Sequence, residues 1–289
     1  MDKPKIRIPV KRKIEATRTL LQSLGLHTVC QEAGCPNRWE CFGRGTATFL
    51  ILGDICTRHC RFCAIASGMP DAPDPDEPEK VAEAAERMQL KYVVITSVTR
   101  DDLPDGGAGH FAETIQAVRR RMPDAGIEVL TPDFNGEVCS IETVLDAQPT
   151  VFNHNIETVA RLTPLLRNRA SYLRSLAVLE YAGRYAPGIP VKSGIMAGAG
   201  ERPEEVRETL RDLRLAGCTI ITIGQYLAPS VEHYAVQEYI TEEMFGQYRQ
   251  WAAELQFSGI AIGPLVRSSY RAEEYQRIAK KNSGPALEA

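Results

Sequence analysis

The sequence lacks a long apolar run, a marked excess of one charge and an export signal. None of its apolar stretches approaches the roughly 18 residues that a transmembrane helix needs. Lysine and arginine total 34 against 37 aspartate and glutamate, and the formal net charge of −3 favours neither nucleic acid nor a membrane as a partner. The N-terminal segment has no signal-peptide core, and Asp2 and Glu15 fit a mitochondrial transit peptide poorly. We therefore expect a cytoplasmic protein.

Two common catalytic patterns are also missing, because neither a Ser-His-Asp grouping nor a Walker-type phosphate loop is visible. Cysteine, in contrast, is plentiful: the chain has 8, and six of them lie between Cys30 and Cys63. A secreted disulfide framework would need an export signal and is usually smaller. In a reducing compartment, thiols packed this closely are better explained as metal ligands.

Beyond residue 45 the chain alternates short apolar, β-branched runs with longer amphipathic stretches. We expect strands over 46–52, 92–97, 127–130, 151–155, 191–196 and 219–224. We expect helices over 79–90, 109–121, 140–147, 172–185, 203–216 and 241–255, the last capped by Thr241. Six β/α units in sequence predict an α/β protein with a parallel sheet, open or curled into a partial barrel. In a barrel the loops after the strands build the active site, and here these loops carry most of the chemically capable residues.

The motif Cys56-Thr-Arg-His-Cys60-Arg-Phe-Cys63 directly follows the first expected strand. Three thiolates in so short a loop suit three irons of a [4Fe–4S] cluster and leave the fourth iron open. An open iron can chelate the amino and carboxylate groups of S-adenosylmethionine, whose sulfonium an electron from the cluster then cleaves to a carbon radical. The alternative is a zinc site with His59 as the fourth ligand, but that side chain would be cramped within the same tight loop.

The cysteines that come first in the chain, Cys30, Cys35 and Cys41, form another trio with the spacing Cys-x4-Cys-x5-Cys. By itself this spacing fits a metal site and buried or redox-active thiols equally well. Beside the Cys56–Cys63 loop it favours a second metal centre. Residues 1–45, which contain this trio, look like an extension or cap rather than an independent core.

Together these motifs resemble the lipoyl synthases, a family within the radical S-adenosylmethionine superfamily. The stretch CQEAGCPNRWECFGRGTATFLILGDICTRHCRFC carries both cysteine motifs with the spacing of that family. Further similar segments are TSVTRDDLPDGGAGHFA, VFNHNIETVARL, KSGIMAGAGE, TIGQYLAPS and GPLVRSSYRAEE, so the resemblance covers roughly residues 25–275. It implies a partial (β/α)6 TIM-like barrel over 46–262, an N-terminal cluster-binding extension over 1–45, and a C-terminal strap over 263–289 with the Arg-Ser-Ser-Tyr motif.

The resemblance also implies the cofactors and the chemistry. The implied metal ligands are Cys56, Cys60 and Cys63 for the cluster that cleaves S-adenosylmethionine, and Cys30, Cys35, Cys41 and Ser269 for an auxiliary [4Fe–4S] cluster. The radical would abstract hydrogen from C6 and then C8 of an octanoyl group on a carrier-protein lysine, and sulfur from the auxiliary cluster would be inserted at both positions. The implied partners are an octanoylated lipoyl carrier protein or domain, an electron donor such as flavodoxin or ferredoxin, and a cluster-assembly carrier.

Within the Arg-Ser-Ser-Tyr motif, Ser269 is the favoured fourth ligand and Ser268 the lesser choice. An oxygen ligand is a harder donor than a thiolate, and a weakly held iron suits a cluster that gives up its sulfide. Arg267 is the second catalytic candidate, because a guanidinium can hold a carboxylate such as that of methionine. Alternatively, both serines only shape the chain while Arg267 and Tyr270 do the binding.

Six further residues lie in or just after expected strands and are candidate contacts of S-adenosylmethionine: Thr96, Ser97, Asn153, Glu157, Lys192 and Met196. The family binds the methionyl part near the first two, whereas the polar run at 153–157 suits hydrogen bonds to the ribose or the amine. Lys192 stands inside an apolar run, which is costly unless the lysine is paired, and this favours a site role. A capped strand end is the alternative explanation for Thr96 and Ser97.

Two rival functions stay open at this stage. One is a sister enzyme that adds sulfur to another substrate, which the Arg-Ser-Ser-Tyr motif disfavours. The other is a zinc-stabilised binding module, which an analysis of iron and sulfide would exclude. Cys139 and Cys218 stand apart from both motifs and are expected to be small buried residues.

Overall fold

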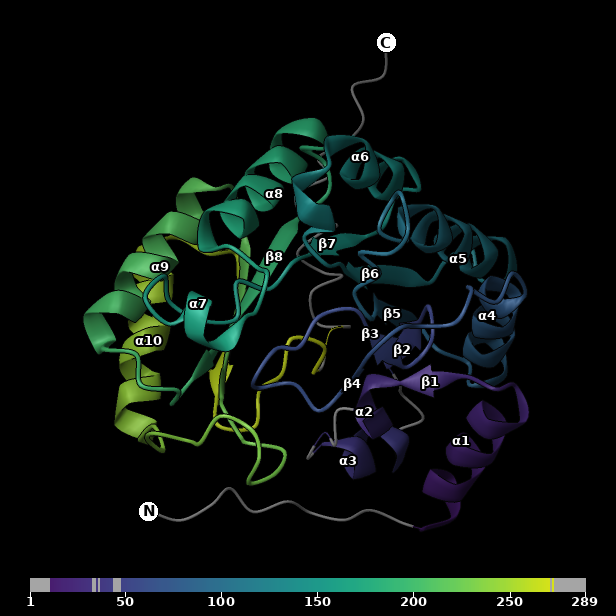
Figure 1. Ribbon diagram of the computed structural model, residues 1–289, viewed down its shortest axis with the longest axis horizontal. Coiled ribbons are helices and arrows are strands. Elements are labelled where there is room, and N and C mark those ends of the chain that lie inside the picture. Colours follow the sequence, from purple (N-terminus) through teal and green to yellow (C-terminus); the bar gives the residue numbers. More distant parts are fainter. Residues whose placement is uncertain (1–10, 33–34, 36, 44–47, 271, 273–289) are drawn as a thin grey trace.

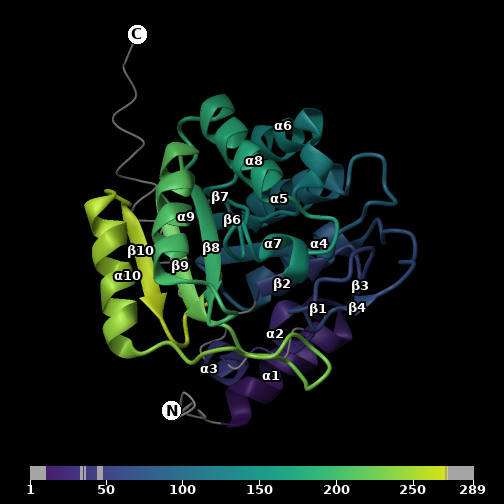
Figure 2. The same ribbon diagram turned by 60° about the vertical axis from the view of Figure 1, so that its left-hand side comes forward.

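The computed structural model describes residues 11–32, 35, 37–43, 48–270 and 272. Its main sheet has the strand order β1-β2-β5-β6-β7-β8-β9-β10 and curls around a central space, with helices on its outside (Figure 1, Figure 2). These strands are β1 (His27–Thr28), β2 (Thr48–Ile51), β5 (Tyr92–Ser97), β6 (Gly126–Leu130), β7 (Val151–Asn153), β8 (Val191–Ala197), β9 (Ile220–Gln225) and β10 (Gly259–Gly263). A separate ribbon pairs β3 (Ile55–Cys56) with β4 (Ala66–Ser67). The expected α/β fold with a curled, mostly parallel sheet is confirmed.

The helices alternate with the strands along the chain. Those of the described N-terminal segment are α1 (Lys11–Ser23), α2 (Val29–Glu32) and α3 (Arg38–Gly43). Those that cover the sheet or follow its strands are α4 (Glu77–Arg87), α5 (Ala108–Arg121), α6 (Val138–Asp146), α7 (Thr163–Leu166), α8 (Tyr172–Tyr185), α9 (Pro203–Leu215) and α10 (Glu242–Glu254), with a 3-10 turn η1 at Phe134–Gly136. The expected cap of the last helix is present, because the Thr241 hydroxyl accepts a hydrogen bond from the Met244 amide at 3.2 Å.

All neighbouring strands from β2 to β10 are parallel. The six expected strands are β2, β5, β6, β7, β8 and β9, and they follow one another in chain order. Their short apolar runs are buried on both faces, as in β5 and β9. The sheet therefore brings the carboxyl ends of these strands to one edge.

Three of the elements that were not expected from the sequence extend the sheet or its core. Strand β10 adds a further parallel strand with Gly259 opposite Ile220, and its terminal glycines hide its pattern. Strand β1 pairs antiparallel with β2, placing His27 opposite Leu50, and has only 2 residues. Helix α1 brings Leu21 into the main core cluster with no exposed surface. The described part of the N-terminal segment therefore extends the sheet and its core.

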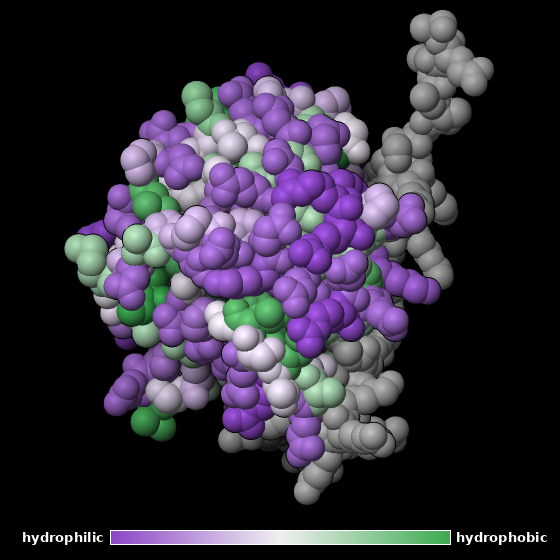
Figure 3. Space-filling model, turned by 90° about the vertical axis from the view of Figure 1, so that its right-hand side faces the viewer, coloured by the Kyte–Doolittle hydropathy of each residue, from purple (hydrophilic) through white to green (hydrophobic). Residues whose placement is uncertain are grey.

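The surface over α4 and α5 is polar (Figure 3). Helices α4 and α5 are joined there by ion pairs such as Arg121–Glu86 at 3.0 Å, and Figure 3 shows that this side of the molecule is mostly hydrophilic. In the part of the chain that the structure describes, no helix is both long enough and apolar enough to cross a membrane. Cys218 is buried as expected, but the expectation for Cys139 is wrong, because this residue is exposed in the first turn of α6.

Candidate active site

A cavity of about 500 Å³ lies at the carboxyl ends of the strands, which is where a β/α barrel places its active site. The volume falls within the range of small-molecule sites. Its walls combine apolar side chains with cysteines, and among its lining residues are Cys30, Cys35, Cys56, Cys60, Cys63, Thr96, Ser97, Asn155, Glu157, Met196, Arg267, Ser268 and Ser269. Both cysteine trios thus contribute to one cavity, although they are separate in the sequence.

The Cys56–Cys63 loop follows β2 and closes one side of this cavity. The backbone amides of Arg58 and Thr99 donate to the Sγ of Cys56 at 3.4 and 3.3 Å. Amide donors to a cysteine sulfur stabilise thiolate character, which is what an iron ligand needs. The Cys63 amide donates to the Cys60 carbonyl at 3.0 Å, so the two cysteines are held on one turn.

Arg58 fixes this loop from behind. Its side chain is 5% exposed and lies 2.7 Å from the carboxylate of Asp133 and 2.8 Å from that of Asp101. Burial by itself raises the pKa of Asp133, but the hydrogen bond and charge of Arg58 outweigh it and bring the pKa to about 2. Asp133 is therefore a permanent anion, and the cysteine loop is tied to the loop after β6.

Burial favours the protonated form of three of these thiols. It raises the pKa of Cys30 and of Cys63 to about 12 each, and that of Cys60 to about 11 although Arg167 partly offsets the effect. A metal must therefore displace protons when it binds these sulfurs. The donor set fits a thiolate-bound cluster.

The geometry also bears on the zinc alternative. Tetrahedral zinc holds its ligand atoms within about 4 Å of one another. Among the described residues, the one group of three or more candidate ligand atoms within 4.8 Å of each other is His27, Glu32 and Asp54. Neither cysteine trio is gathered tightly enough for a single zinc ion, whereas separate irons of a cluster accept a wider spacing.

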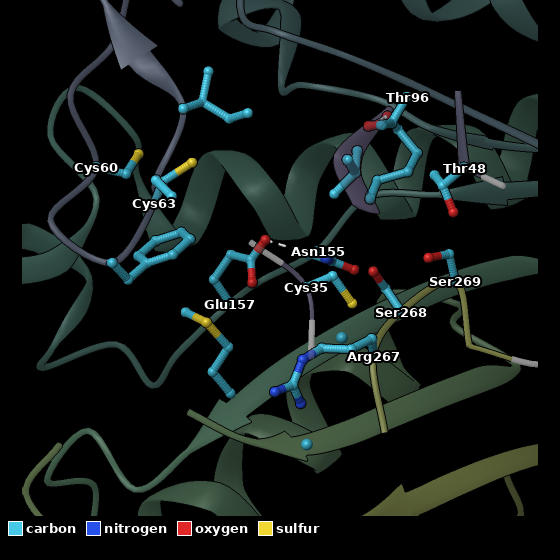
Figure 4. Close-up of a pocket in the computed structure, with 18 of the residues that line it drawn as sticks. Cys35, Thr48, Cys60, Cys63, Thr96, Asn155, Glu157, Arg267, Ser268 and Ser269 are labelled. Atoms are coloured by element: carbon cyan, nitrogen blue, oxygen red, sulfur yellow. Dashed lines mark hydrogen bonds between the residues drawn. The ribbon is translucent and has the colours of Figure 1, made fainter. Parts of the chain in front are cut away.

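The Cys30–Cys41 trio reaches the cavity from the N-terminal segment. Cys30 lies buried in α2 and Cys35 lies between α2 and α3, and both line the cavity. Cys41 lies in α3 and is outside the cavity lining. Of the strap expected over 263–289, residues 264–270 follow β10, and the name strap is used for this described segment from here on. It contributes Arg267 and Ser268 beside Cys35, and Ser269 next to Ser268 (Figure 4). The strap thus lies next to the first trio despite the long sequence separation.

Two hydrogen bonds join the strap to the N-terminal segment. The Asn37 side-chain amide donates to the Leu265 carbonyl at 2.7 Å, and the Tyr270 hydroxyl donates to the Glu40 carboxylate at 3.1 Å. Burial lowers the pKa of Arg267, and the nearby sulfur of Cys35 opposes this shift. The Arg267 charge is therefore close to the first trio.

Between the two trios lie groups suited to a polar ligand. In Figure 4, Asn155 and Glu157 lie between Cys60 and Cys63 on one side and Cys35 on the other. The Ser97 hydroxyl and the Asn155 carbonyl oxygen are buried without a hydrogen-bond partner among the described residues, and both residues line the cavity. Buried polar atoms left without partners favour a bound polar molecule. Ser97 and Asn155 therefore fit a ligand such as S-adenosylmethionine.

Glu157 combines two features typical of a functional site. Its backbone has a φ of +67°, a left-handed conformation that is strained for a residue with a side chain. Burial raises the pKa of its carboxyl, and the Asn155 amide donates to it at 3.1 Å. The backbone also bridges to β8, since the Met196 amide donates to the Glu157 carbonyl at 2.8 Å. Thr96, Ser97, Glu157 and Met196 thus all border the cavity, and their contact with S-adenosylmethionine stays a prediction.

Asn153 and Lys192 differ from that expectation, because neither is among the lining residues. Both lie deeper in the sheet, where Asn153 is opposite Lys192 in the register of β7 and β8. The Lys192 ammonium, with no exposed surface, lies 2.7 Å from Glu128 and donates to the Ser268 carbonyl at 2.6 Å. Desolvation lowers the pKa of Lys192 and Glu128 opposes the shift. The lysine is paired, as its place in an apolar run required, but with Glu128 below the cavity and with the backbone carbonyl of Ser268.

Sequence reasoning missed two buried arginines at the site, Arg58 and Arg167. Arg167 lines the cavity and donates to the Ile156 carbonyl at 3.1 Å and to the Ser175 hydroxyl at 3.0 Å. No local pattern marks Arg167. Arg58 lies inside a cysteine motif, and its partner Asp101 follows a strand. These two positions are the sequence features from which a role for Arg58 at the site could have been predicted.

Comparison with known proteins defines the class first. Residues 50–213 match the model of the Radical SAM superfamily. The fold is similar to that of HydG, a maturase of the [FeFe]-hydrogenase, with a TM-score of 0.58 and 12% identity over 91% of this chain and 58% of that one. It is also similar to methylornithine synthase (PylB), with a TM-score of 0.55 and 15% identity over 84% of this chain and 73% of that one. At such low identity these structures support the fold alone.

The curated relatives define the family within that class. The chain is 52% identical over 274 residues to the lipoyl synthase of Caldicellulosiruptor saccharolyticus, covering 95% of this chain and 96% of the relative. It is likewise 52% identical over 268 residues to the lipoyl synthase of Thermus thermophilus, covering 92% and 83%. The chain belongs to the lipoyl synthase family. Membership confirms the expected enzyme class and its cofactors, [4Fe–4S] clusters and S-adenosylmethionine.

Proposed function

We propose that this chain inserts two sulfur atoms, at C6 and C8, into an octanoyl group attached to a lysine of a lipoyl carrier protein or domain. The observation that carries the proposal is the convergence of Cys30 and Cys35 from one trio, all three cysteines of the other, and the strap serines on one cavity. A single cluster would need one trio. Cysteines from both trios on the same cavity suit a sulfur source placed beside a radical source.

The residues divide between two cluster sites. Cys56, Cys60 and Cys63 would hold the cluster that binds S-adenosylmethionine, and Cys30, Cys35, Cys41 and Ser269 would hold the auxiliary cluster. When bound, the clusters supply the electron that cleaves S-adenosylmethionine and the sulfide that is inserted. The chain's part is to hold both sites on one cavity and to keep water from it.

The remaining lining residues suit the two organic ligands. Ser97, Asn155 and Glu157 line the cavity with polar groups, which would orient S-adenosylmethionine. Apolar side chains including Leu50, Val98, Leu130, Ile195 and Val266 also line the cavity and would hold an alkyl chain out of water. A carbon radical needs such a dry pocket, because water and stray donors would divert it.

Ser269 is our choice for the fourth auxiliary ligand, with Ser268 second. Both serines line the cavity, with Ser268 next to Cys35 and Ser269 beyond it on the side of Thr48 (Figure 4). Sequence resemblance favours the second serine of the motif. Arg267 would hold a carboxylate or balance the charge of the auxiliary cluster, since its charge lies near Cys35. An electron donor such as flavodoxin or ferredoxin, a cluster-assembly carrier and a reducing cytoplasm complete the proposal.

Two triple variants test it after anaerobic reconstitution. The parent should bind about eight irons, from two four-iron clusters. Changing Cys56, Cys60 and Cys63 to Ala should leave about four irons and abolish 5′-deoxyadenosine formation. Changing Cys30, Cys35 and Cys41 to Ala should leave 5′-deoxyadenosine formation measurable while lipoyl product disappears. Lipoyl product from the second variant would overturn the sulfur-source role.

A single variant tests the serine ligand. Ser269→Ala should lose lipoyl formation and weaken the auxiliary cluster while 5′-deoxyadenosine still forms. Lipoyl formation at the parent rate with a full iron content would refute the ligand assignment. Ser269→Cys is the sharper probe, because a thiolate should let the cluster assemble yet slow or stop the release of sulfur.

A further inference from the structure

Lys192 links the interior of the barrel to the strap. It is the second residue of β8 and has no exposed surface. Its ammonium donates to the Glu128 carboxylate at 2.7 Å and to the Ser268 carbonyl at 2.6 Å. A buried ion pair is not by itself a strong source of stability, so stability alone does not explain why a lysine stands at position 192. The contact with Ser268 supplies one.

The carboxylate of Glu128 is held from three strands. The Tyr92 hydroxyl of β5 donates to it at 3.1 Å, the Asn153 amide of β7 at 3.3 Å, and Lys192 of β8 completes the set. Glu128 itself is fully buried on β6. This network fixes the lysine, so that a further N–H is presented to the strap from a rigid support.

The Ser268 carbonyl shares a planar peptide unit with the amide nitrogen of Ser269. A hydrogen bond that fixes the Ser268 carbonyl oxygen therefore also fixes the orientation of the peptide plane that contains the nitrogen and Cα of Ser269. The other two tethers, from Asn37 and Glu40, belong to the N-terminal segment that carries the first trio. Beyond the strap, Ala272 is 2% exposed and packs in a small cluster with Tyr92, Val94, Val151 and Ile220 inside the barrel.

We propose that Lys192 is a positioning residue for the auxiliary cluster: it holds the Ser268 carbonyl so that the Ser269 hydroxyl faces the first trio. The inference rests on the proposed ligand role of Ser269. It replaces the expected contact between Lys192 and S-adenosylmethionine, which the position of the lysine below the cavity does not favour. Lys192 acts through the strap and touches no reacting atom.

The test uses three variants of the reconstituted enzyme. Lys192→Met removes the tether. Lys192→Met with Glu128→Gln removes it without leaving a buried charge unpaired. Lys80→Met is the matched control, because its ammonium pairs with Asp74 at 2.6 Å on the exposed surface, away from the strap. Each variant is measured for iron content, 5′-deoxyadenosine, lipoyl product and the amide hydrogen exchange of residues 264–270 by mass spectrometry.

Both Lys192 variants should exchange the strap amides at least about tenfold faster, because a buried charge-assisted hydrogen bond is lost. Iron should fall toward four per chain, and lipoyl formation should fall at least about tenfold while 5′-deoxyadenosine stays within about twofold of the parent. Lys80→Met should match the parent throughout.

Three results would overturn the inference. The first is unchanged strap exchange in both Lys192 variants. The second is restored strap protection in the double variant, which would trace the effect to the unpaired charge of Glu128. The third is a parallel loss of 5′-deoxyadenosine and lipoyl product, as a contact with S-adenosylmethionine would give. Ser269→Ala separates this inference from the proposed function. If this variant keeps lipoyl formation, the ligand role of Ser269 fails. The hydrogen exchange of the strap in the Lys192 variants still shows whether Lys192 holds the strap.

Discussion

Arg58 and Asp133 form a buried ion pair of 2.7 Å that joins the loop of the second cysteine trio to the loop following β6. Asp133 has no exposed side-chain surface, and its other oxygen lies 3.2 Å from Arg174 at the start of α8. Three segments of the barrel rim thus meet at one carboxylate. The cysteine loop is held in place before any iron binds, which lowers the entropy that cluster binding must overcome.

Asp133→Asn should lower the free energy of unfolding of the metal-free protein by about 3 kcal/mol, because it leaves the buried Arg58 charge with Asp101 alone. The measurement is urea unfolding under anaerobic, reducing conditions. Glu83→Gln is the control: it breaks an exposed pair with Arg87 and should cost no more than about 0.5 kcal/mol. Equal losses in the two variants would contradict the importance of the buried pair.

His154 should make the metal-free protein sensitive to mild acid. Burial lowers its pKa from 6.5 to about 4, and its ring nitrogens contact the Thr131 carbonyl and the Ser175 hydroxyl at 2.9 Å each. Because the unfolded chain takes up the proton first, the contribution is fully present above pH 6.5 and is lost as the pH falls from 6.5 toward 4. The full loss is about 3 kcal/mol.

Urea unfolding at a series of pH values measures this dependence. His154→Gln keeps a hydrogen-bonding side chain that cannot titrate. Between pH 4 and 6.5 the free energy of unfolding of this variant should therefore fall less steeply with falling pH than that of the parent, by the slope that corresponds to about one bound proton. Identical pH profiles for the parent and His154→Gln would show that His154 does not titrate in this way.

Gly224→Ala should displace the strap without altering any charge. A Cβ at Gly224 would lie 2.0 Å from the Val266 carbonyl oxygen, and a backbone atom can move only if the strap moves with it. We expect iron to fall toward four per chain and lipoyl formation to drop at least about tenfold, whereas 5′-deoxyadenosine formation survives. Gly188→Ala is the matched control, since a Cβ there meets nothing within 4 Å. A full iron content in Gly224→Ala would be the contrary result.

Thiol reactivity should follow burial in the metal-free protein. At pH 8, iodoacetamide should label exposed Cys139 first, while Cys30, Cys60 and Cys63 react slowly because burial keeps them protonated. Their rates should rise about tenfold per pH unit toward pH 11, as read by peptide mass spectrometry. Cys139→Ser should remove the fast phase alone. Labelling of the three buried thiols at the rate of Cys139 would contradict the predicted protonation.

The sequence determined the local elements and the types of chemistry. The spans expected at 92–97 and 172–185 agree with β5 and α8, because apolar, β-branched runs and helical periodicity are properties of neighbouring residues. The short cysteine spacings likewise restricted the metal to a few kinds of centre. Strand β10 escaped notice because its glycines carry no side-chain pattern, and its pairing with β9 decides its structure.

Lys192 shows what the sequence determines and what only the tertiary structure decides. Its place in an apolar run required a buried partner, since desolvating an unpaired ammonium is prohibitively costly. Which partner it takes is a matter of tertiary structure: Glu128 is 64 positions away along the chain and Ser268 is 76 positions away. Only the closing of parallel strands around the interior brings these groups within hydrogen-bond distance. The same closing puts cysteines of both trios and the strap on one cavity, because contacts over such separations depend on how the sheet curls rather than on any local preference.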